Sequence, residues 1–213
     1  MAFGLVFELV PGATPKKPGS PGEDEFLGRG VSYFATRDAP FFKGKDAICV
    51  GGRDVALEEA IHLSKFAASV IMVHRRDRFR GAQILQDHVR RLPNVSFALE
   101  SVVESISGTD KVERMALRNV RTSRRCELAT DGVFIFVGYR PNSGPVRALA
   151  ELDEAGAVVT ESAMETSQEG LYAVGDVRKS SFRQIATAAG NGATAAVVDV
   201  PRSLIQWCSN ADG

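Results

Sequence analysis

A short apolar run that ends in two glycines most narrowly limits how this chain can fold. Residues 46–50 (Asp-Ala-Ile-Cys-Val) precede Gly51 and Gly52, and residues 54–66 carry apolar side chains at helical spacing. A buried strand, a glycine turn and an amphipathic helix in this order are typical of a parallel α/β sheet. Asp54 lies near the helix start, where its charge suits the positive end of the helix dipole.

The alternation of strands and helices continues beyond this unit. The pattern predicts strands at 69–73, 94–99 and 133–137, a helix at 81–92, and a β-meander that includes 112–119 and 126–128. This order predicts an α/β fold with a doubly wound, Rossmann-like sheet and right-handed crossovers.

Two segments rich in proline and glycine mark junctions. Residues 11–30 contain four of the nine prolines and five glycines, and residues 141–145 read Pro-Asn-Ser-Gly-Pro. Such segments are turns and linkers rather than helices. We therefore expect a central domain at 31–143 between two flanking segments, 1–30 and 144–213.

The flanking segments carry their own elements. Residues 1–7 are predicted to form a strand, as are residues 171–174, and residues 183–198 form an Ala-rich helix. Pro201 is expected to end or kink that helix, because proline lacks the N–H that a helix interior requires.

Composition argues against several functional classes. Lys and Arg number 26, as do Asp and Glu, so bulk charge gives no reason to expect binding to nucleic acid or to an anionic membrane. No apolar run approaches the ~18 residues of a membrane helix. The three cysteines, at 49, 126 and 208, form neither a CxxC nor a Cys/His cluster. We therefore expect no metal site and a reducing, cytoplasmic compartment.

The glycine turn resembles a dinucleotide-binding fingerprint in part. A GxGxxG/A motif needs a tight turn, a close approach of the backbone to the pyrophosphate, and a small residue between helix and strand. Gly51 and Ala56 fit the first and third of these roles, but Arg53 stands where the second glycine belongs. Its side chain either crowds a pyrophosphate or pairs with phosphate from outside, and a plain Gly-Gly turn explains the motif equally well.

A basic segment follows the second predicted strand of this region. Residues 74–80 read His-Arg-Arg-Asp-Arg-Phe-Arg and lie about 20 residues past the glycines, where a Rossmann unit contacts the adenosine ribose. Arginines at this place favour the 2′-phosphate of NADP, because a guanidinium pairs with phosphate through two hydrogen bonds. The alternative interpretation is a solvated basic turn.

Seven motifs together give the chain a specific resemblance, which extends from about residue 10 to residue 198. The chain resembles low-molecular-weight thioredoxin reductase at Gly12-Ala13-Thr14-Pro15, at Leu57-Glu58-Glu59-Ala60, at His74-Arg75-Arg76, and at residues 21–26, 28–33, 131–135 and 175–177. The resemblance implies an NADPH-binding domain inserted into an FAD-binding domain, with hydride passing from NADPH through flavin to a CxxC disulfide and then to thioredoxin.

The resemblance also assigns roles to residues. Gly51, Gly52 and Ala56 would hold the NADPH pyrophosphate, and Arg75, Arg76 and Arg80 its 2′-phosphate. Asp176 would hold the FAD ribityl chain, and Asp38 would protonate a departing thiolate. The remaining residues expected at the cofactors are Arg53, Asp54, His74, Gly138, Gly175, Val177, Arg183, Gln184 and Ile185.

The chain departs from the family pattern at the redox motif and at its start. Phe34 and Arg37 flank Ala35-Thr36, where the family has Cys-Ala-Thr-Cys, and neither side chain can act as a thiolate. The family's first GxGxxG unit, which binds the FAD pyrophosphate, has no counterpart here. We therefore expect residues 1–30 and 144–213 to form an incomplete, N-terminally truncated FAD-binding domain of the three-layer ββα type. Such a domain would expose apolar edges and would not bind FAD tightly alone.

Three hypotheses follow. The chain is an FAD- and NADPH-dependent oxidoreductase that cannot reduce disulfides and uses another acceptor; or a non-catalytic module that binds NADPH or a protein; or a degenerate remnant of a reductase. The family implies a thioredoxin-like partner and a homodimer, alongside the nicotinamide nucleotide.

Overall fold

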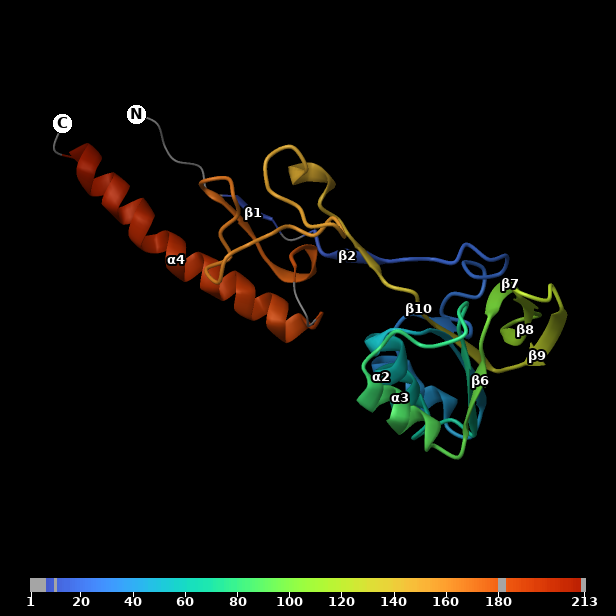
Figure 1. Cartoon of the computed structure of the whole chain (residues 1–213). Coiled ribbons are helices and arrows are strands. Elements are labelled where there is room, and N and C mark those ends of the chain that lie inside the picture. Colours follow the sequence, from blue (N-terminus) through green and yellow to red (C-terminus); the bar gives the residue numbers. More distant parts are fainter. Residues whose placement is uncertain (1–6, 10, 180–182, 212–213) are drawn as a thin grey trace. The chain divides into compact units, whose positions relative to one another are not determined.

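The computed structural model describes residues 7–9, 11–179 and 183–211 (Figure 1). The chain forms two compact units, one from residues 1–14 and 139–213 and the other from residues 15–138. Residues 1–6 of the predicted first strand lie outside the described residues, and β1 is Phe7–Leu9.

The unit of residues 15–138 is built on a five-stranded parallel sheet. Its strands lie in the order β3, β10, β4, β5, β6, with bounds Val31–Ser32, Gly132–Phe136, Asp46–Gly51, Ser69–Val73 and Val95–Ala98. Residue pairing is parallel throughout, as in Cys49 opposite Met72 and Phe134 opposite Cys49. The predicted parallel α/β sheet is thus confirmed.

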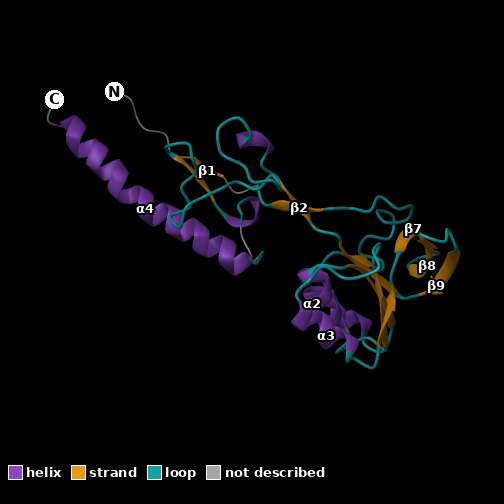
Figure 2. Cartoon of the chain, viewed as in Figure 1, coloured by secondary structure: helices purple, strands orange, loops and turns teal. Residues whose placement is uncertain are grey.

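Helices cover one face of this sheet (Figure 2). They are α1 (Ala35–Asp38), α2 (Asp54–Leu63) and α3 (Gln83–Arg90), and a 3₁₀ turn, η1 (Ala39–Phe42), follows α1. Ala47 and Cys49 of β4 point into the core beneath the helices, whereas Ile48 and Val50 belong to the core of the opposite face. This alternation follows from the two-residue repeat of a strand.

A three-stranded antiparallel meander covers the opposite face. It consists of β7 (Ser101–Gly108), β8 (Val112–Asn119) and β9 (Arg125–Ala129). Ile106, Met115 and Leu117 are buried between it and the sheet. Strand β7 was not predicted, because most of its residues are only half-buried and several are Ser or Glu.

Helix ends differ from the predictions by a few residues. The helix expected over 54–66 ends at Leu63, and the one expected over 81–92 begins at Gln83. The segment before α3 is held by other hydrogen bonds, described below, so it does not join the helix.

The proline- and glycine-rich segment 15–30 packs with the five-stranded sheet. Phe26 is 2% exposed and lies in the same buried cluster as Met115. The Ile106 N–H donates to Pro21 O at 2.8 Å, and the Val112 N–H donates to Arg29 O at 2.9 Å. The unit boundary therefore falls after Thr14 instead of near residue 30.

The other unit contains two small sheets and a long helix. β1 pairs in parallel with β12 (Leu171–Ala173), and β2 (Ala13–Pro15) pairs with β11 (Tyr139–Pro141). Two 3₁₀ turns are η2 (Gly144–Val146) and η3 (Gly175–Val177). Ala195 of α4 (Ile185–Ala211) is buried in one cluster with Tyr172 and Val174, and α4 contacts η3.

The predicted end of the last helix is wrong. Helix α4 continues beyond residue 198 and through Pro201 to Ala211. A proline removes one backbone donor, and the hydrogen bonds on either side can continue the helix at a cost. No helix in the described ranges is long and apolar enough to span a bilayer.

Candidate functional site

The turn between β4 and α2 leaves no room for a side chain at Gly51. A Cβ there would lie 2.5 Å from the Cβ of Ala56 and 2.6 Å from the carbonyl oxygen of Phe136. Ala56 is itself fully buried. Gly51 and Ala56 therefore allow the start of α2 to pack directly against β4 and β10.

Gly52 is pressed against the ring of His74. A Cβ on Gly52 would lie 2.4 Å from both Cε1 and Nδ1 of that ring. The Nε2 atom of His74 is buried and has no hydrogen-bond partner among the described residues. Burial lowers the pKa of His74, and the charges of Arg75 and Arg76 lower it further, which favours a neutral imidazole.

The loop after β5 is fastened to this turn by two hydrogen bonds. The Arg80 N–H donates to Gly52 O at 2.7 Å, and the Ala82 N–H donates to Asp54 Oδ1 at 2.7 Å. Gly81 fits because a Cβ there would lie 2.6 Å from Cδ1 of Leu57. Asp54, expected near a cofactor, thus anchors the loop, a contact that no sequence pattern indicated.

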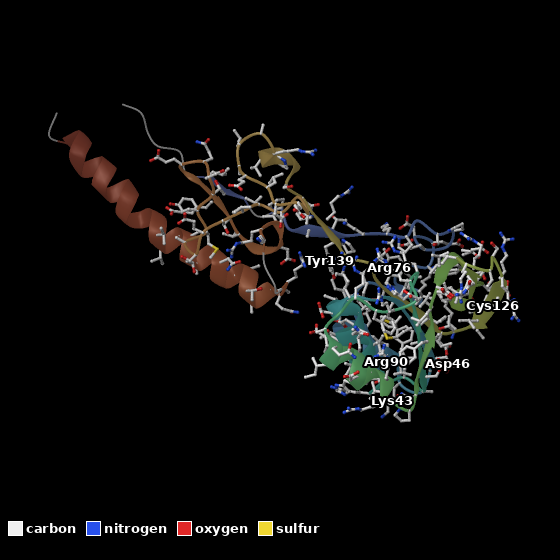
Figure 3. All side chains as sticks on the ribbon, in the orientation of Figure 1. Lys43, Asp46, Arg76, Arg90, Cys126 and Tyr139 are labelled. Carbon is white, nitrogen blue, oxygen red and sulfur yellow. The ribbon has the colours of Figure 1, made fainter. Side chains whose placement is uncertain are left out.

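Arginine side chains surround the joined turn and loop. Arg53, Arg75, Arg76 and Arg80 are all exposed, and Figure 3 labels Arg76 among the side chains of this unit. None of the four guanidiniums forms an ion pair with a residue that the structure describes. Four uncompensated positive charges beside a helix start can hold phosphate groups, so these residues fit a phosphorylated nucleotide.

A second group of residues surrounds Asp38. The Ser32 hydroxyl donates to Asp38 Oδ2 at 2.6 Å, and the Phe34 N–H donates to Ser32 Oγ at 3.0 Å. The Arg37 guanidinium binds both carboxylate oxygens of Asp38 and lies 5.3 Å from the centre of the Phe34 ring. The hydrogen bond from Arg37 is the largest influence that lowers the pKa of Asp38, and Ser32 adds to it.

The Asp38 group borders an open groove of about 380 Å³, which Arg37 and Phe41 also line. Phe41 is 72% exposed and Phe34 is 49% exposed. The nearest cysteine in sequence, Cys49, is fully buried, and burial raises the pKa of its thiol. The groove thus offers charged and aromatic groups. No described cluster of His, Cys, Asp or Glu could hold a metal ion.

The residues expected to bind FAD fall mainly in the unit with α4. Asp176 in η3 is half-buried and its carboxylate has no hydrogen-bond partner among the described residues, so it is free to accept a hydroxyl. Gly175 and Val177 beside it are buried, and α4 contacts η3. A carboxylate without a hydrogen-bond partner can accept hydrogen bonds from the hydroxyl groups of a polyol chain.

The remaining expected residues lie in different settings. The Arg183 guanidinium lies 5.2 Å from the centre of the Tyr139 ring, while Gln184 is exposed and Ile185 is 90% exposed. Gly138 ends the unit of residues 15–138, where its carbonyl oxygen accepts the Lys16 N–H at 2.8 Å.

Residues 9–192 match the family described as pyridine nucleotide-disulphide oxidoreductase. The match spans most of the chain, which therefore belongs to the pyridine nucleotide-disulphide oxidoreductase family. FAD and NADPH are the cofactors of the thioredoxin reductases within it, and both are consistent with this membership.

Similar proteins are thioredoxin reductases. The one from Treponema pallidum is 44% identical over 188 residues, which are 88% of this chain and 61% of that protein. The one from Bacillus subtilis is 44% identical over 189 residues, 88% of this chain and 60% of that protein. The chain thus spans about three-fifths of the length of these relatives.

Solved structures give the same result. The thioredoxin reductase from Streptococcus pyogenes superposes with a TM-score of 0.81 at 42% identity, over 94% of this chain and 66% of that one. The enzyme from Giardia duodenalis gives a TM-score of 0.80 at 32% identity, with the same coverage.

Proposed function

We propose that residues 15–138 bind NADPH at the β4–α2 turn. One observation carries this proposal: the exposed guanidiniums of Arg75, Arg76 and Arg80 form no ion pair with the residues that the structure describes, and they belong to a loop that the Arg80 N–H joins to Gly52 O at 2.7 Å. The 2′-phosphate of NADPH supplies the missing anion, because guanidinium and phosphate pair through charged hydrogen bonds.

The chain's own residues bind and orient the nucleotide. Gly51, Gly52 and Ala56 hold the start of α2 against the sheet, and His74 packs on Gly52 with Nε2 free to accept or donate a hydrogen bond. NADPH supplies a hydride when bound, and the residues of the site hold the nucleotide in place. In the other unit, Asp176 would accept hydroxyl groups of FAD, with Gly175, Val177, Arg183, Gln184 and Ile185 as the further proposed contacts. Gly138, at the end of the unit of residues 15–138, is a separate proposed cofactor contact.

We propose in addition that residues 34–37 carry out no dithiol–disulfide exchange. Phe34 and Arg37 supply no sulfur, and the Arg37 guanidinium keeps Asp38 ionised, so its carboxylate is not poised to give up a proton. Any oxidoreductase activity therefore uses an acceptor other than a disulfide at this position. A protein-binding module without catalysis is the second candidate, favoured by the exposed Phe34 and Phe41 beside the Asp38 group.

The cellular setting follows from the same family. We propose a cytoplasmic protein that recognises a thioredoxin-like partner and forms a homodimer. Among the described cysteines, Cys49 and Cys126 are both free, which fits a reducing compartment.

Nucleotide titration tests the proposed function. NADPH and NADH are titrated by calorimetry into wild-type protein, Arg76→Ala, and Arg91→Ala as an exposed control at the far end of α3. Wild type should prefer NADPH, and Arg76→Ala should lose about tenfold or more in NADPH affinity while NADH is unaffected. Equal affinities for both nucleotides in wild type would overturn the proposal.

Acceptor assays separate the two candidates. Wild-type protein loaded with FAD is mixed with NADPH and either an artificial dye or a disulfide substrate. Dye reduction without disulfide reduction supports the oxidoreductase; no reduction of either supports the binding module.

A further inference from the structure

Arg53 is an unfavourable residue for the place it occupies. It is the N-cap of α2, where Ser, Thr, Asp or Asn normally accepts a hydrogen bond from the first turn. Arginine has donors only, and α2 has no side-chain cap. Its positive charge also meets the positive end of the helix dipole. Both features weaken the free protein and favour a bound anion.

Backbone donors beside Arg53 remain open. The N–H groups of Asp54, Val55 and Ala56 donate no hydrogen bond within the described part of the chain. Arg53 itself has an extended backbone, with φ −104° and ψ −178°, and its side chain is exposed and reaches no carboxylate in that part. The Arg53 side chain is therefore accessible to a ligand.

A second strip of backbone, at residues 80 and 81, lies against the same turn. Gly81 packs so closely on the turn that a Cβ there would lie 3.1 Å from the carbonyl carbon of Arg53. The neighbouring Arg80 is bound to Gly52 through its N–H. Asp54, next to Arg53, already accepts the Ala82 N–H. Neither Arg53 nor Arg80 forms an ion pair within the described part of the chain.

We infer that Arg53 is a ligand-binding residue whose guanidinium binds the diphosphate bridge of the nucleotide. In a GxGxxG turn the second glycine lets the backbone itself approach the pyrophosphate. Here a side chain with five donors takes over that contact from outside the turn. The identity of the nucleotide rests on the proposed function, whereas pairing of Arg53 with a diphosphate does not.

Two classes of arginine then contact different parts of the ligand. Arg53 contacts the diphosphate that NADPH and NADH share, and Arg76 contacts the 2′-phosphate that only NADPH has. Loss of Arg53 should weaken both nucleotides equally, and loss of Arg76 should weaken NADPH alone.

Inorganic pyrophosphate, NADPH and NADH are titrated into the full chain as wild type, Arg53→Ala, Arg53→Gly, Arg53→Lys and Arg91→Ala. Circular dichroism verifies that each variant is folded. Arg53→Ala should weaken all three ligands by about tenfold or more, as expected for one charge-assisted contact. Arg53→Lys should bind more tightly than Arg53→Ala and less tightly than wild type, because the lysine ammonium keeps the positive charge but not the guanidinium fork. Arg91→Ala should match wild type.

Several results would overturn the inference. The first is that wild-type protein does not bind pyrophosphate, and the second is that Arg53→Ala binds pyrophosphate as tightly as wild type. The third is that Arg53→Gly binds NADPH more tightly than wild type, which would mean that Arg53 obstructs the site. The two proposals fail separately. NADPH affinity that falls in Arg76→Ala but not in Arg53→Ala retains the function alone, and Arg53-dependent pyrophosphate binding without NADPH binding retains this inference alone.

Discussion

The guanidinium of Arg37 binds the carboxylate of Asp38, the next residue in the chain, through both oxygens. Nε donates to Oδ1 at 2.6 Å, and Nη2 donates to Oδ2 at 3.0 Å. Such a fork fits the planar carboxylate and favours its ionised form. The Asp38 carboxylate therefore acts as a hydrogen-bond acceptor, and Arg37 and Ser32 supply its donors without a thiol.

Replacing Arg37 by Ala should raise the pKa of Asp38. In wild type the folded-state pKa is lowered, so Asp38 contributes stability that is present above its unfolded pKa of about 3.9 and is lost as the pH falls through the folded value. The variant should lose this contribution at a higher pH than wild type does. Carboxyl NMR titration measures the shift, Arg91→Ala is the control, and an unchanged Asp38 titration would contradict the prediction.

Replacing Gly51 by Ala should destabilise the protein. The added Cβ meets the Cβ of Ala56 and the backbone oxygen of Phe136, neither of which can turn aside. Overpacking of this kind lowers the free energy of unfolding by about 1–3 kcal/mol. Urea unfolding tests it against Gly144→Ala, where nothing lies within 4 Å of the added atom. Equal stability of the two variants would argue against this packing.

Removing the hydroxyl of Tyr33 should also destabilise the protein. That hydroxyl donates to Glu23 Oε1 at 2.5 Å, and Glu23 is 2% exposed. Tyr33→Phe leaves a buried carboxylate oxygen short of a donor, at a cost of about 1–3 kcal/mol. Tyr172→Phe is the matched control, since that buried tyrosine has no hydroxyl partner among the described residues.

Alkaline pH provides a second readout for the same pair. Burial is the main cause that raises the pKa of Tyr33, and the bond to Glu23 adds to it. The contribution of Tyr33 to stability is therefore complete below its unfolded pKa of about 10 and is lost as the pH rises through the folded value. Thermal midpoints between pH 8 and 11 should fall more steeply in wild type than in Tyr33→Phe.

Acid pH should act on His74. Its folded pKa is lowered, chiefly by burial, so its contribution to stability is complete above the unfolded pKa of about 6.5 and is lost as the pH falls through the folded value. Thermal midpoints from pH 8 to 5 should fall more in wild type than in His74→Phe. The exposed His88, replaced in the same way, is the control. Parallel curves for wild type and His74→Phe would refute the prediction.

Local patterns sufficed for the parallel sheet and its helices. Strand β4 and helix α2 follow from the spacing of apolar residues around Gly51 and Gly52. The strand β7 depends on partners in β8, and its own residues are too polar to identify it. Likewise, residues 15–30 read as a linker, because the packing of Phe26 on Met115 joins residues far apart in the chain.

In the candidate site, too, some features could be predicted from local sequence and others depend on contacts between distant residues. Sequence spacing predicted that the glycine turn at Gly51 and Gly52 and the basic segment 74–80 belong to one site. It could not show that Asp54 accepts the Ala82 N–H across 28 residues, or that the His74 ring occupies the space above Gly52. Asp38 was expected as a proton donor by resemblance; the spacing could not show that Arg37 would bind both of its carboxylate oxygens.

The hydrogen bond from the Lys16 N–H to Gly138 O brings the two ends of the segment 15–138 together at 2.8 Å. A segment whose first and last residues lie together can be removed from one chain and inserted into another without disturbing the core of either part. Recombination between related genes could therefore exchange residues 15–138 without changing the path of the chain on either side.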